Sequence, residues 1–251
     1  MKTGIVLGGG SGKAFAHLGV LKALEEAGIV PDAISASSSG SIVGAFIASG
    51  LKPYETLELM KQYRFLDYVS MNLPMKGMLS LNSLERNLEK QLPAHTFAEL
   101  ELPLYVSVSN LNSGKVEYIH AGPLAAVIKA ACSLPFVFSP VKLNGQLYLD
   151  GGLLDNLPYT PLVDLCDRII VISISRTAEI KMFDNLKDIA ARVIEMIVNQ
   201  DSENAKRNSD LYIEPTGMED YKILDLSRRA DEFYKTGYDY CKKLLSSKSI
   251  Y

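Results

Sequence analysis

The amino-acid sequence predicts an α/β fold in which helices cover a mainly parallel central sheet. The chain begins with an apolar run at 4–8, a helical pattern at 14–27, a second apolar run at 33–37 and a helix that ends near residue 50. This strand–helix–strand–helix order is typical of a parallel sheet. The Val- and Ile-rich run at 168–175 has the composition of a strand buried on both faces. With 251 residues and 47% hydrophobic content, the chain can bury a large core.

The remaining elements follow from the spacing of apolar residues and from turn residues. Further strands are expected at 104–110, 115–120 and 211–215, and further helices at 53–63, 82–91, 123–132, 186–199 and about 229–246. The dipeptide Asn144-Gly145 separates the apolar runs 141–143 and 146–149, and it is the strongest two-residue hairpin signal in the chain. Because no repeat or linker-like change of composition occurs, we expect one domain over residues 1–251.

Two apolar stretches lack the periodicity of a helix or strand. Residues 133–140 contain Pro135 and Pro140, and they are expected to form an ordered loop. Residues 64–81 place large apolar side chains between turn residues. They predict a core segment beneath a loop or, as the alternative, a mobile apolar flap.

Charge and hydropathy narrow the class of protein. A formal net charge of −3 and a pI near 5.7 argue against a general nucleic-acid binder, which carries a concentrated basic surface. No apolar run approaches the ~20 residues of a membrane-spanning helix, so any membrane contact is expected to be peripheral. Met1-Lys2-Thr3 leads directly into the first strand and leaves no room for a signal peptide, which favours the cytoplasm.

Three consecutive serines follow the second strand and precede a helix rich in small residues. A nucleophile elbow places a serine on such a turn, and the residues two before and two after it must be small because strand and helix cross closely. Ser38 meets this requirement with Ala36 and Gly40, whereas Ser37 and Ser39 have serines at both positions. Ser38 is therefore the candidate nucleophile. The alternative is an ordinary helix start at which Ser37 or Ser39 caps free N–H groups.

The glycine cluster at 8–12 lies between the first strand and the first helix, where backbone N–H groups attract negative charge. A dinucleotide fingerprint that starts at Gly8 needs glycine at position 13, which is Lys13. A Walker loop needs glycine in place of Leu7 and a hydroxyl residue in place of Ala14. Two interpretations are left: an oxyanion hole for acyl transfer, or a tight strand-to-helix turn without chemistry.

A serine nucleophile needs a base, and the chain has three histidines to test. None follows Asp150, which excludes the chain order Ser–acid–His with this acid. His17 lies inside the first helix and is expected to be packed or hydrogen-bonded, while His95 and His120 are expected in loops. Asp150, at the end of the predicted hairpin and followed by two glycines, is the better candidate. Its alternative is a turn residue, since Asp-Gly is common in turns.

Five blocks of sequence, taken in order, resemble the patatin-like phospholipases, including their small bacterial members. They are Gly8-Gly9-Gly10 before a basic residue, His17-Leu18-Gly19-Val20-Leu21, the elbow at Ser38, Ser133-Leu134-Pro135 with Pro140, and Asp150-Gly151. The resemblance covers residues 4 to about 155. It implies a three-layer α/β sandwich that hydrolyses fatty acyl esters of phospholipids or other lipids, with a Ser-Asp dyad and without a metal or cofactor.

The same resemblance implies roles for individual residues. Ser38 would be the nucleophile and Asp150 the base. The expected oxyanion hole is the backbone of Gly9, Gly10, Ser11 and Gly12, and the expected substrate contacts are Lys13, Ser39 and Pro135. Because a carboxylate stays ionised below the pKa of ~6.5 of an imidazole, the acidic limb of activity is expected well below that value.

The chain departs from the family pattern at two places. The family usually has glycine where Ala36 stands, and Arg-Gly where Lys13-Ala14 stand. Since these positions adjoin the elbow and the glycine loop, the alternative is a non-catalytic lipid-binding or regulatory module on the same fold. Phospholipids, lysophospholipids, neutral glycerides and thioesters are all compatible with the sequence as substrates.

Overall fold

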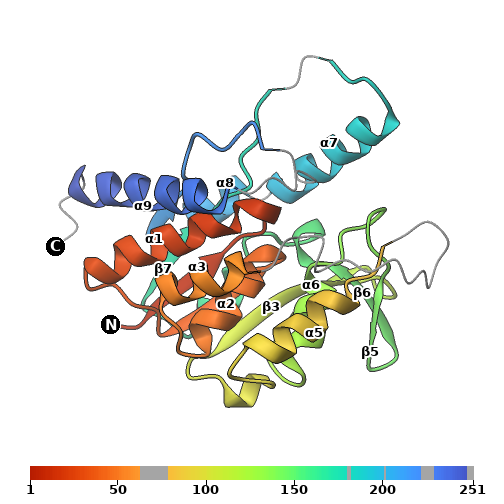
Figure 1. Ribbon diagram of the computed structural model, residues 1–251, viewed down its shortest axis with the longest axis horizontal. Helices are drawn as coiled ribbons and strands as arrows, with labels where there is room; N and C mark the ends of the chain where they lie inside the picture. The colour runs from red at the N-terminus through yellow and green to blue at the C-terminus, as the bar shows by residue number, and fades with distance from the viewer. Residues whose placement is uncertain (63–78, 180–181, 201, 222–228, 248–251) are drawn as a thin grey trace.

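The computed structural model describes residues 1–62, 79–179, 182–200, 202–221 and 229–247 (Figure 1). The structural statements that follow concern these residues. Most of the apolar segment at 64–81, expected to be a core segment or a flap, lies outside them.

An eight-stranded mixed sheet forms the middle of the structure. Neighbouring strands run parallel in the order β3 (Leu104–Asn110), β2 (Ala33–Ser37), β1 (Thr3–Leu7), β7 (Arg168–Ile172) and β8 (Leu211–Ile213). Antiparallel pairing on the β3 side adds β4 (Lys115–Ile119) and the hairpin of β5 (Val141–Leu143) and β6 (Gln146–Asp150). The prediction of a mainly parallel sheet is confirmed.

The turn between β5 and β6 has the conformation that its sequence favours. Asn144 and Gly145 both have positive φ, at 48° and 84°. A two-residue type I′ turn needs positive φ at both positions, which Asn and Gly adopt at low cost. The predicted hairpin is therefore confirmed, and it ends at Asp150.

The central strands send alternate side chains into two hydrophobic clusters. Ile5 and Leu7 of β1 join a large cluster on one face of the sheet, whereas Val6 joins a smaller cluster on the other face. In β7, Ile172 and Val171 divide in the same way. Because neither face of these strands meets water, their sequences are continuous apolar runs rather than alternating ones.

Helices cover the two faces unequally. The large cluster takes side chains from α1 (Phe15–Glu26), α2 (Ser39–Ala48), α3 (Pro53–Lys61), α5 (Asn82–Gln91), α6 (Leu124–Ala131), α7 (Leu186–Asn199) and α9 (Ala230–Ser247). The smaller cluster is covered by Ala205 of α8 (Ser202–Arg207) together with Leu157 and Leu162. The result is a three-layer arrangement with one thin outer layer. Helix α8 was not expected from the sequence, because six residues are too few to show a helical period.

Helix α9 lies along α1 at a distance set by two glycines (Figure 1). A Cβ atom on Gly19 of α1 would lie 1.9 Å from the carbonyl oxygen of Tyr234, and one on Gly237 of α9 would lie 2.1 Å from the carbonyl oxygen of Ala16. No side chain fits at such distances, so the two backbones touch. This contact fixes the last described helix against the helix that follows the glycine cluster.

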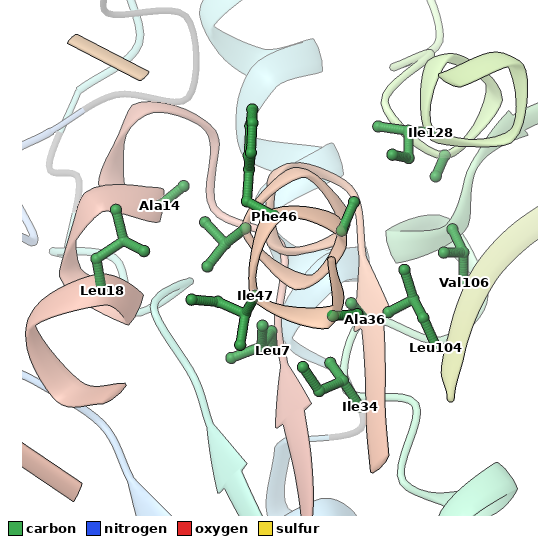
Figure 2. Packing of buried hydrophobic residues seen from close by; sticks show 14 of the residues in the cluster. Leu7, Ala14, Leu18, Ile34, Ala36, Phe46, Ile47, Leu104, Val106 and Ile128 are labelled. Carbon is green, nitrogen blue, oxygen red and sulfur yellow. The ribbon is translucent and has the colours of Figure 1, made fainter. Parts of the chain in front are cut away.

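Helix α2 is enclosed by the sheet and by α1, α3 and α6. Figure 2 shows its side chain Ile47 beside Leu7 of β1, whereas Phe46 points away from Leu7. Phe46 is 1% exposed, and replacing such a side chain by alanine costs about 3–5 kcal/mol. This packing anchors the C-terminal part of α2, and the first turn of the helix follows β2 directly.

Two strands share one edge of β3. Strand β2 pairs with the first half of β3 and ends at the pair Ser37–Ser107, whereas β6 pairs with the second half through Asp150–Val108. Strand β4 overlaps both halves and must therefore occupy the opposite edge. The ends of β2 and β6 consequently meet at consecutive residues of β3.

Candidate active site

Ser38 forms the turn between β2 and α2 in a strained backbone conformation. Its φ of 48° and ψ of −130° lie where residues other than glycine are rarely found. The strain accompanies a close crossing of the chain, because a Cβ atom on Gly40 would lie 2.3 Å from the carbonyl oxygen of Leu7. The small residue two positions after the serine is thus a steric requirement. Backbone strain of this kind is concentrated at functional sites.

Only Ser38 of the three adjacent serines donates to a carboxylate. Its Oγ lies 2.6 Å from Asp150 Oδ2. Ser39 Oγ accepts from the amide of Gly10 at 3.2 Å, and Ser37 Oγ is buried with no hydrogen-bond partner among the described residues. The N-cap residue of α2 is Ser38, without a side-chain capping bond. The alternative in which Ser37 or Ser39 caps the helix is therefore wrong.

Asp150 is a buried carboxylate with a hydrogen bond to each oxygen. It is 3% exposed, and while Oδ2 accepts from Ser38, Oδ1 accepts from the amide of Gly152 at 2.8 Å. Burial raises the pKa of Asp150 to about 6, against the opposing effect of these two bonds. A carboxylate with this pKa is a stronger base than an exposed aspartate. This pKa predicts an acidic limb of activity near pH 6.

The glycine loop passes directly beside Ser38. A Cβ atom on Gly9 would lie 2.7 Å from Ser38 Cβ, so only glycine fits. The loop continues into a short 3-10 turn, η1 (Ser11–Ala14), whose first bond runs from Lys13 N to the carbonyl oxygen of Gly10 at 3.2 Å. The amides of Ser11 and Gly12 precede that bond, and such amides have no acceptor within their own turn.

Asn156 is a residue of the site that no sequence pattern predicted. Its Oδ1 accepts from the amide of Gly9 at 2.9 Å, and its Nδ2 donates to the carbonyl oxygen of Gly9 at 3.4 Å. The side chain is buried. The contact joins residues that are 147 positions apart, so no local pattern reveals it. The only sequence signal is a polar residue among leucines shortly after Asp150.

The expected substrate contacts differ in their surroundings. Lys13 is buried, and its Nζ donates to the carbonyl oxygen of Arg176 at 3.0 Å. Burial lowers the pKa of Lys13 to about 8, while nearby carboxylates, led by Glu195, raise it. Ser39 is bonded to the glycine loop, as described. Pro135 is half-buried and lies two residues after Ser133, whose carbonyl oxygen accepts from the amide of Asp150 at 3.0 Å.

His17 has a structural place, as predicted. It is fully buried, and its Nε2 donates to the carbonyl oxygen of Gly8 at 2.7 Å. Burial lowers the pKa of His17 to about 4, so the imidazole is neutral at physiological pH. His95 and His120 are exposed residues outside helices and strands, also as predicted.

A second small residue lies beside the unusual Ala36. Ala36 is fully buried, and a Cβ atom on Gly44 of α2 would lie 3.4 Å from its methyl group. This is an ordinary van der Waals distance, so α2 packs on the Ala36 methyl group without a clash at Gly44. The departure from the family pattern leaves the elbow conformation of Ser38 in place.

The described residues bring no three His, Cys, Asp or Glu side chains together in an arrangement suited to a metal ion. Cys132 lies near the carboxylate of Asp150, and burial first and that charge second raise the pKa of its thiol. The thiol is therefore protonated at neutral pH. None of the described helices combines the length and the apolar character needed to cross a bilayer.

Comparison with known sequences finds relatives among lipid hydrolases. "Lysophospholipase NTE1" of Cryptococcus neoformans is 30% identical over 67% of this chain and 11% of its own length. "Lysophospholipase nte1" of Aspergillus fumigatus is 27% identical over 96% of this chain and 18% of its own. An "Uncharacterized NTE family protein" of Mycobacterium tuberculosis is 29% identical over 69% of this chain. The match spans about half of the mycobacterial relative and less than a fifth of the fungal ones.

Solved structures share the fold. VipD from Legionella pneumophila superposes with a TM-score of 0.63 and 16% identity, over 98% of this chain and 67% of that chain. ExoU from Pseudomonas aeruginosa, in complex with SpcU, superposes with a TM-score of 0.53 and 14% identity, over 98% and 52% of the two chains. A family model described as patatin-like phospholipase matches residues 5–163, which include Ser38, Asp150 and Asn156. Because the match covers most of the chain and includes both Ser38 and Asp150, the chain belongs to the patatin-like phospholipase family.

Proposed function

We propose that this chain is a serine acyl hydrolase that cleaves fatty acyl esters of lipids with a Ser38–Asp150 dyad. The observation that carries the proposal is the 2.6 Å hydrogen bond from Ser38 Oγ to Asp150 Oδ2 at a strained strand-to-helix turn. Membership of the family supports hydrolysis of lipid esters. The names of the fungal relatives make lysophospholipids the first substrates to test.

In the first step, Ser38 Oγ attacks the carbonyl carbon of the ester while its proton passes to Asp150 Oδ2. The carboxylate is already at hydrogen-bond distance, which is the geometry that general base catalysis needs. The amide of Gly152 holds the other carboxylate oxygen and so orients the base. The new carboxylic acid then gives its proton to the departing alkoxide, which leaves as an alcohol.

The charge on the tetrahedral intermediate is stabilised by amides of the glycine loop. The amides of Ser11 and Gly12 are the best placed donors, because they precede the first bond of η1. The amide of Gly10 joins them when the hydroxyl of Ser39 turns away. The amide of Gly9 donates to Asn156 and is not counted among these donors. Because Gly9 has no side chain, the loop can lie close to Ser38. Each such donor is typically worth about 10² to 10³ in turnover.

In the second step, water attacks the acyl-Ser38 carbonyl and gives a proton to Asp150. Collapse of the second intermediate releases the fatty acid, and Ser38 Oγ regains its proton from Asp150. Ester and water are converted to acid and alcohol, and the protein returns to its starting protonation state. Pro135 is proposed to border the acyl chain, because the loop that contains it begins at a residue bonded to the amide of Asp150.

The alternative is a lipid-binding module without turnover. The observation that favours it is that the amides of Gly9 and Gly10 already donate to side chains. Such a module would bind a lysophospholipid without releasing a fatty acid.

Release of fatty acid from lysophosphatidylcholine tests the proposal, together with labelling by a fluorophosphonate. The wild-type protein should release fatty acid and carry the label on Ser38, and Ser38→Ala should lose both. The matched control is Ser37→Ala, because this neighbouring hydroxyl has no hydrogen-bond partner among the described residues. It should keep activity and label. Label on Ser37 or Ser39, or equal turnover in folded Ser38→Ala, would overturn the assignment.

A further inference from the structure

Helix α7 carries a stripe of large apolar side chains that faces solvent. Leu186 is 79% exposed and Met196 63%. Counted at 100° per residue, the four stripe residues within the helix fall inside a sector of about 80°. The preceding segment adds two exposed apolar residues. The interfacial stripe, as we call it, consists of Met182, Phe183, Leu186, Ile189, Val193 and Met196.

The stripe is not the face by which α7 packs on the protein. Ile194, 5% exposed, belongs to the hydrophobic core, and Val198 packs against it. The sequence predicts an amphipathic helix here, and the structure shows apolar residues on two faces, one inward and one outward. Contiguous exposed apolar side chains on one helix indicate a surface that another apolar surface covers.

The position of α7 relates the stripe to the candidate active site. Helix α7 contacts the short turn η3 (Gly151–Leu153), which follows Asp150 directly. In Figure 1 the helix projects from the body of the structure rather than lying across it. A partner that covers the stripe would therefore contact the helix that packs against the turn after Asp150.

Another exposed apolar residue lies in a loop that is hydrogen-bonded to Asp150. Phe136 is 80% exposed and has a φ of 66°. A bulky aromatic residue in this conformation is strained, and its exposure in water brings no compensating burial. Its loop begins at Ser133, whose carbonyl oxygen accepts from the amide of Asp150. Exposed apolar side chains thus occur on α7, which contacts the turn after Asp150, and on the loop that is hydrogen-bonded to the amide of Asp150.

The charges of α7 identify the kind of surface that fits. Lys187 and Arg192 are balanced by Asp188 and Glu195, so the helix has no net charge. The whole chain has a formal net charge of −3. Attraction to anionic headgroups, which helps basic interfacial helices, is absent here. Apolar contact alone would have to hold the helix at an interface.

We propose that the interfacial stripe of α7 docks the protein on a lipid surface with zwitterionic headgroups. The inference rests on the proposed function, because a lipid ester substrate resides in such a surface. Apolar side chains of the stripe enter the boundary between headgroups and acyl chains. Phe136 adds an anchor beside the same site.

Sedimentation with phosphatidylcholine vesicles tests the docking directly. The starting protein is Ser38→Ala, so that no turnover occurs. It is compared with the same protein carrying Ile189→Gln, Val193→Gln and Met196→Gln together. Glutamine preserves helix propensity while removing the apolar surface. The triple change should weaken vesicle binding about tenfold or more. Addition of an anionic lipid should not raise the affinity of the starting protein.

The matched control is Val163→Gln with Leu165→Gln. These side chains are 50% and 43% exposed, and the segment lies near Gly4 at the opposite end of the parallel strands. This control should bind vesicles like the starting protein. With active Ser38, hydrolysis of a soluble short-chain ester should be the same in the triple variant and wild type, whereas hydrolysis of vesicle lipid should fall in the variant.

The outcomes separate this proposal from the proposed function. Vesicle binding that needs the stripe, without any ester hydrolysis, would support docking and overturn the hydrolase. Ester hydrolysis with no vesicle binding, or with binding equal in the triple variant, would overturn docking alone. A change from dimer to monomer in the triple variant, measured by light scattering and with vesicle binding unaltered, would make the stripe an interface between two copies and would also overturn the proposal.

Discussion

Asn156 is hydrogen-bonded to both backbone groups of Gly9, at 2.9 Å to the amide and 3.4 Å to the carbonyl oxygen. Gly9 lies against Ser38, and Asn156 lies in the loop that follows β6 and its last residue, Asp150. The two bonds therefore hold the glycine loop at a defined distance from the Ser38–Asp150 pair. We therefore expect Asn156 to act as a positioning residue for the proposed oxyanion hole.

Replacement of Asn156 by alanine should lower both stability and turnover. The buried amide of Gly9 loses its acceptor, which costs about 1–3 kcal/mol of unfolding free energy. A displaced loop weakens oxyanion stabilisation, so we expect kcat to fall about 10- to 100-fold with KM little changed. Urea unfolding and steady-state kinetics measure the two effects. The control Asn208→Ala, at an exposed helix end, should change neither, and unaltered kcat in folded Asn156→Ala would contradict the role.

Replacement of Asp150 by asparagine should lower turnover by about 10² to 10⁴, because the amide has nearly the size of the carboxylate but no basicity. Stability at neutral pH should rise rather than fall, since the folded protein no longer buries a charge. Ester hydrolysis and thermal unfolding of the same preparation measure both. Full activity in the folded variant would remove Asp150 from the mechanism.

The acidic limb of kcat/KM should lie near pH 6, which is the pKa that burial gives to Asp150. Activity is lost below this value because the protonated carboxyl cannot accept the proton of Ser38. His17→Gln should leave the limb in place, because the pKa of His17 is about 4. A limb near pH 4, or one that moves in folded His17→Gln, would assign the titration to another group.

Asp150 and His17 should have opposite effects on the pH dependence of stability. Because the pKa of Asp150 is raised, stability is lost as pH rises from about 4 to 6 and the buried carboxyl group becomes charged. The lowered pKa of His17 means that stability is lost as pH falls from about 6.5 to 4. Each effect amounts to about 3 kcal/mol at 1.36 kcal/mol per pKa unit, so the two nearly cancel in the wild type.

Variants at these two positions should separate the effects. Relative to wild type, His17→Gln should gain stability as pH falls from about 6 to 4, because only Asp150 is left to titrate. Asp150→Asn should lose stability over the same range, because only His17 is left. Denaturant unfolding at several pH values gives these differences. Parallel curves for both variants and wild type would contradict the assigned pKa values.

Two glycines of α2 allow a matched test of the close backbone crossing at Ser38. Gly40→Ala would place a methyl group 2.3 Å from a backbone oxygen, and we expect a loss of about 1–3 kcal/mol or more. Gly44→Ala would meet only side chains, at 3.1 Å from Leu104, 3.3 Å from Ile34 and 3.4 Å from Ala36, which can shift slightly, and the helix gains about 1 kcal/mol from alanine. Gly44→Ala should therefore be nearly neutral. Equal unfolding free energies for the two variants would contradict the close crossing at Ser38.

Local sequence was sufficient for the elements and for the individual residues with local requirements. Buried strands such as 168–172 are apolar runs, and Asn144-Gly145 adopts the type I′ conformation that this dipeptide favours. The choice of Ser38 among three serines followed from the small residues around it, and the structural place of His17 followed from its apolar neighbours. Helix α8 was missed because it is short.

Contacts between distant segments were decided only by the tertiary structure. Ser38 and Asp150 meet because β2 and β6 follow one another along the same edge of β3, and no local spacing encodes which strand edges pair. The Asn156–Gly9 bonds, the engagement of Lys13 with Arg176 and the pKa of Asp150 depend on burial among residues far apart in the chain. The sequence by itself determined the strands, the helices and the candidate nucleophile, because steric and hydrophobic preferences act over a few residues. The tertiary structure determined which polar groups face each other, because desolvation and hydrogen bonding depend on the packed neighbours of each group.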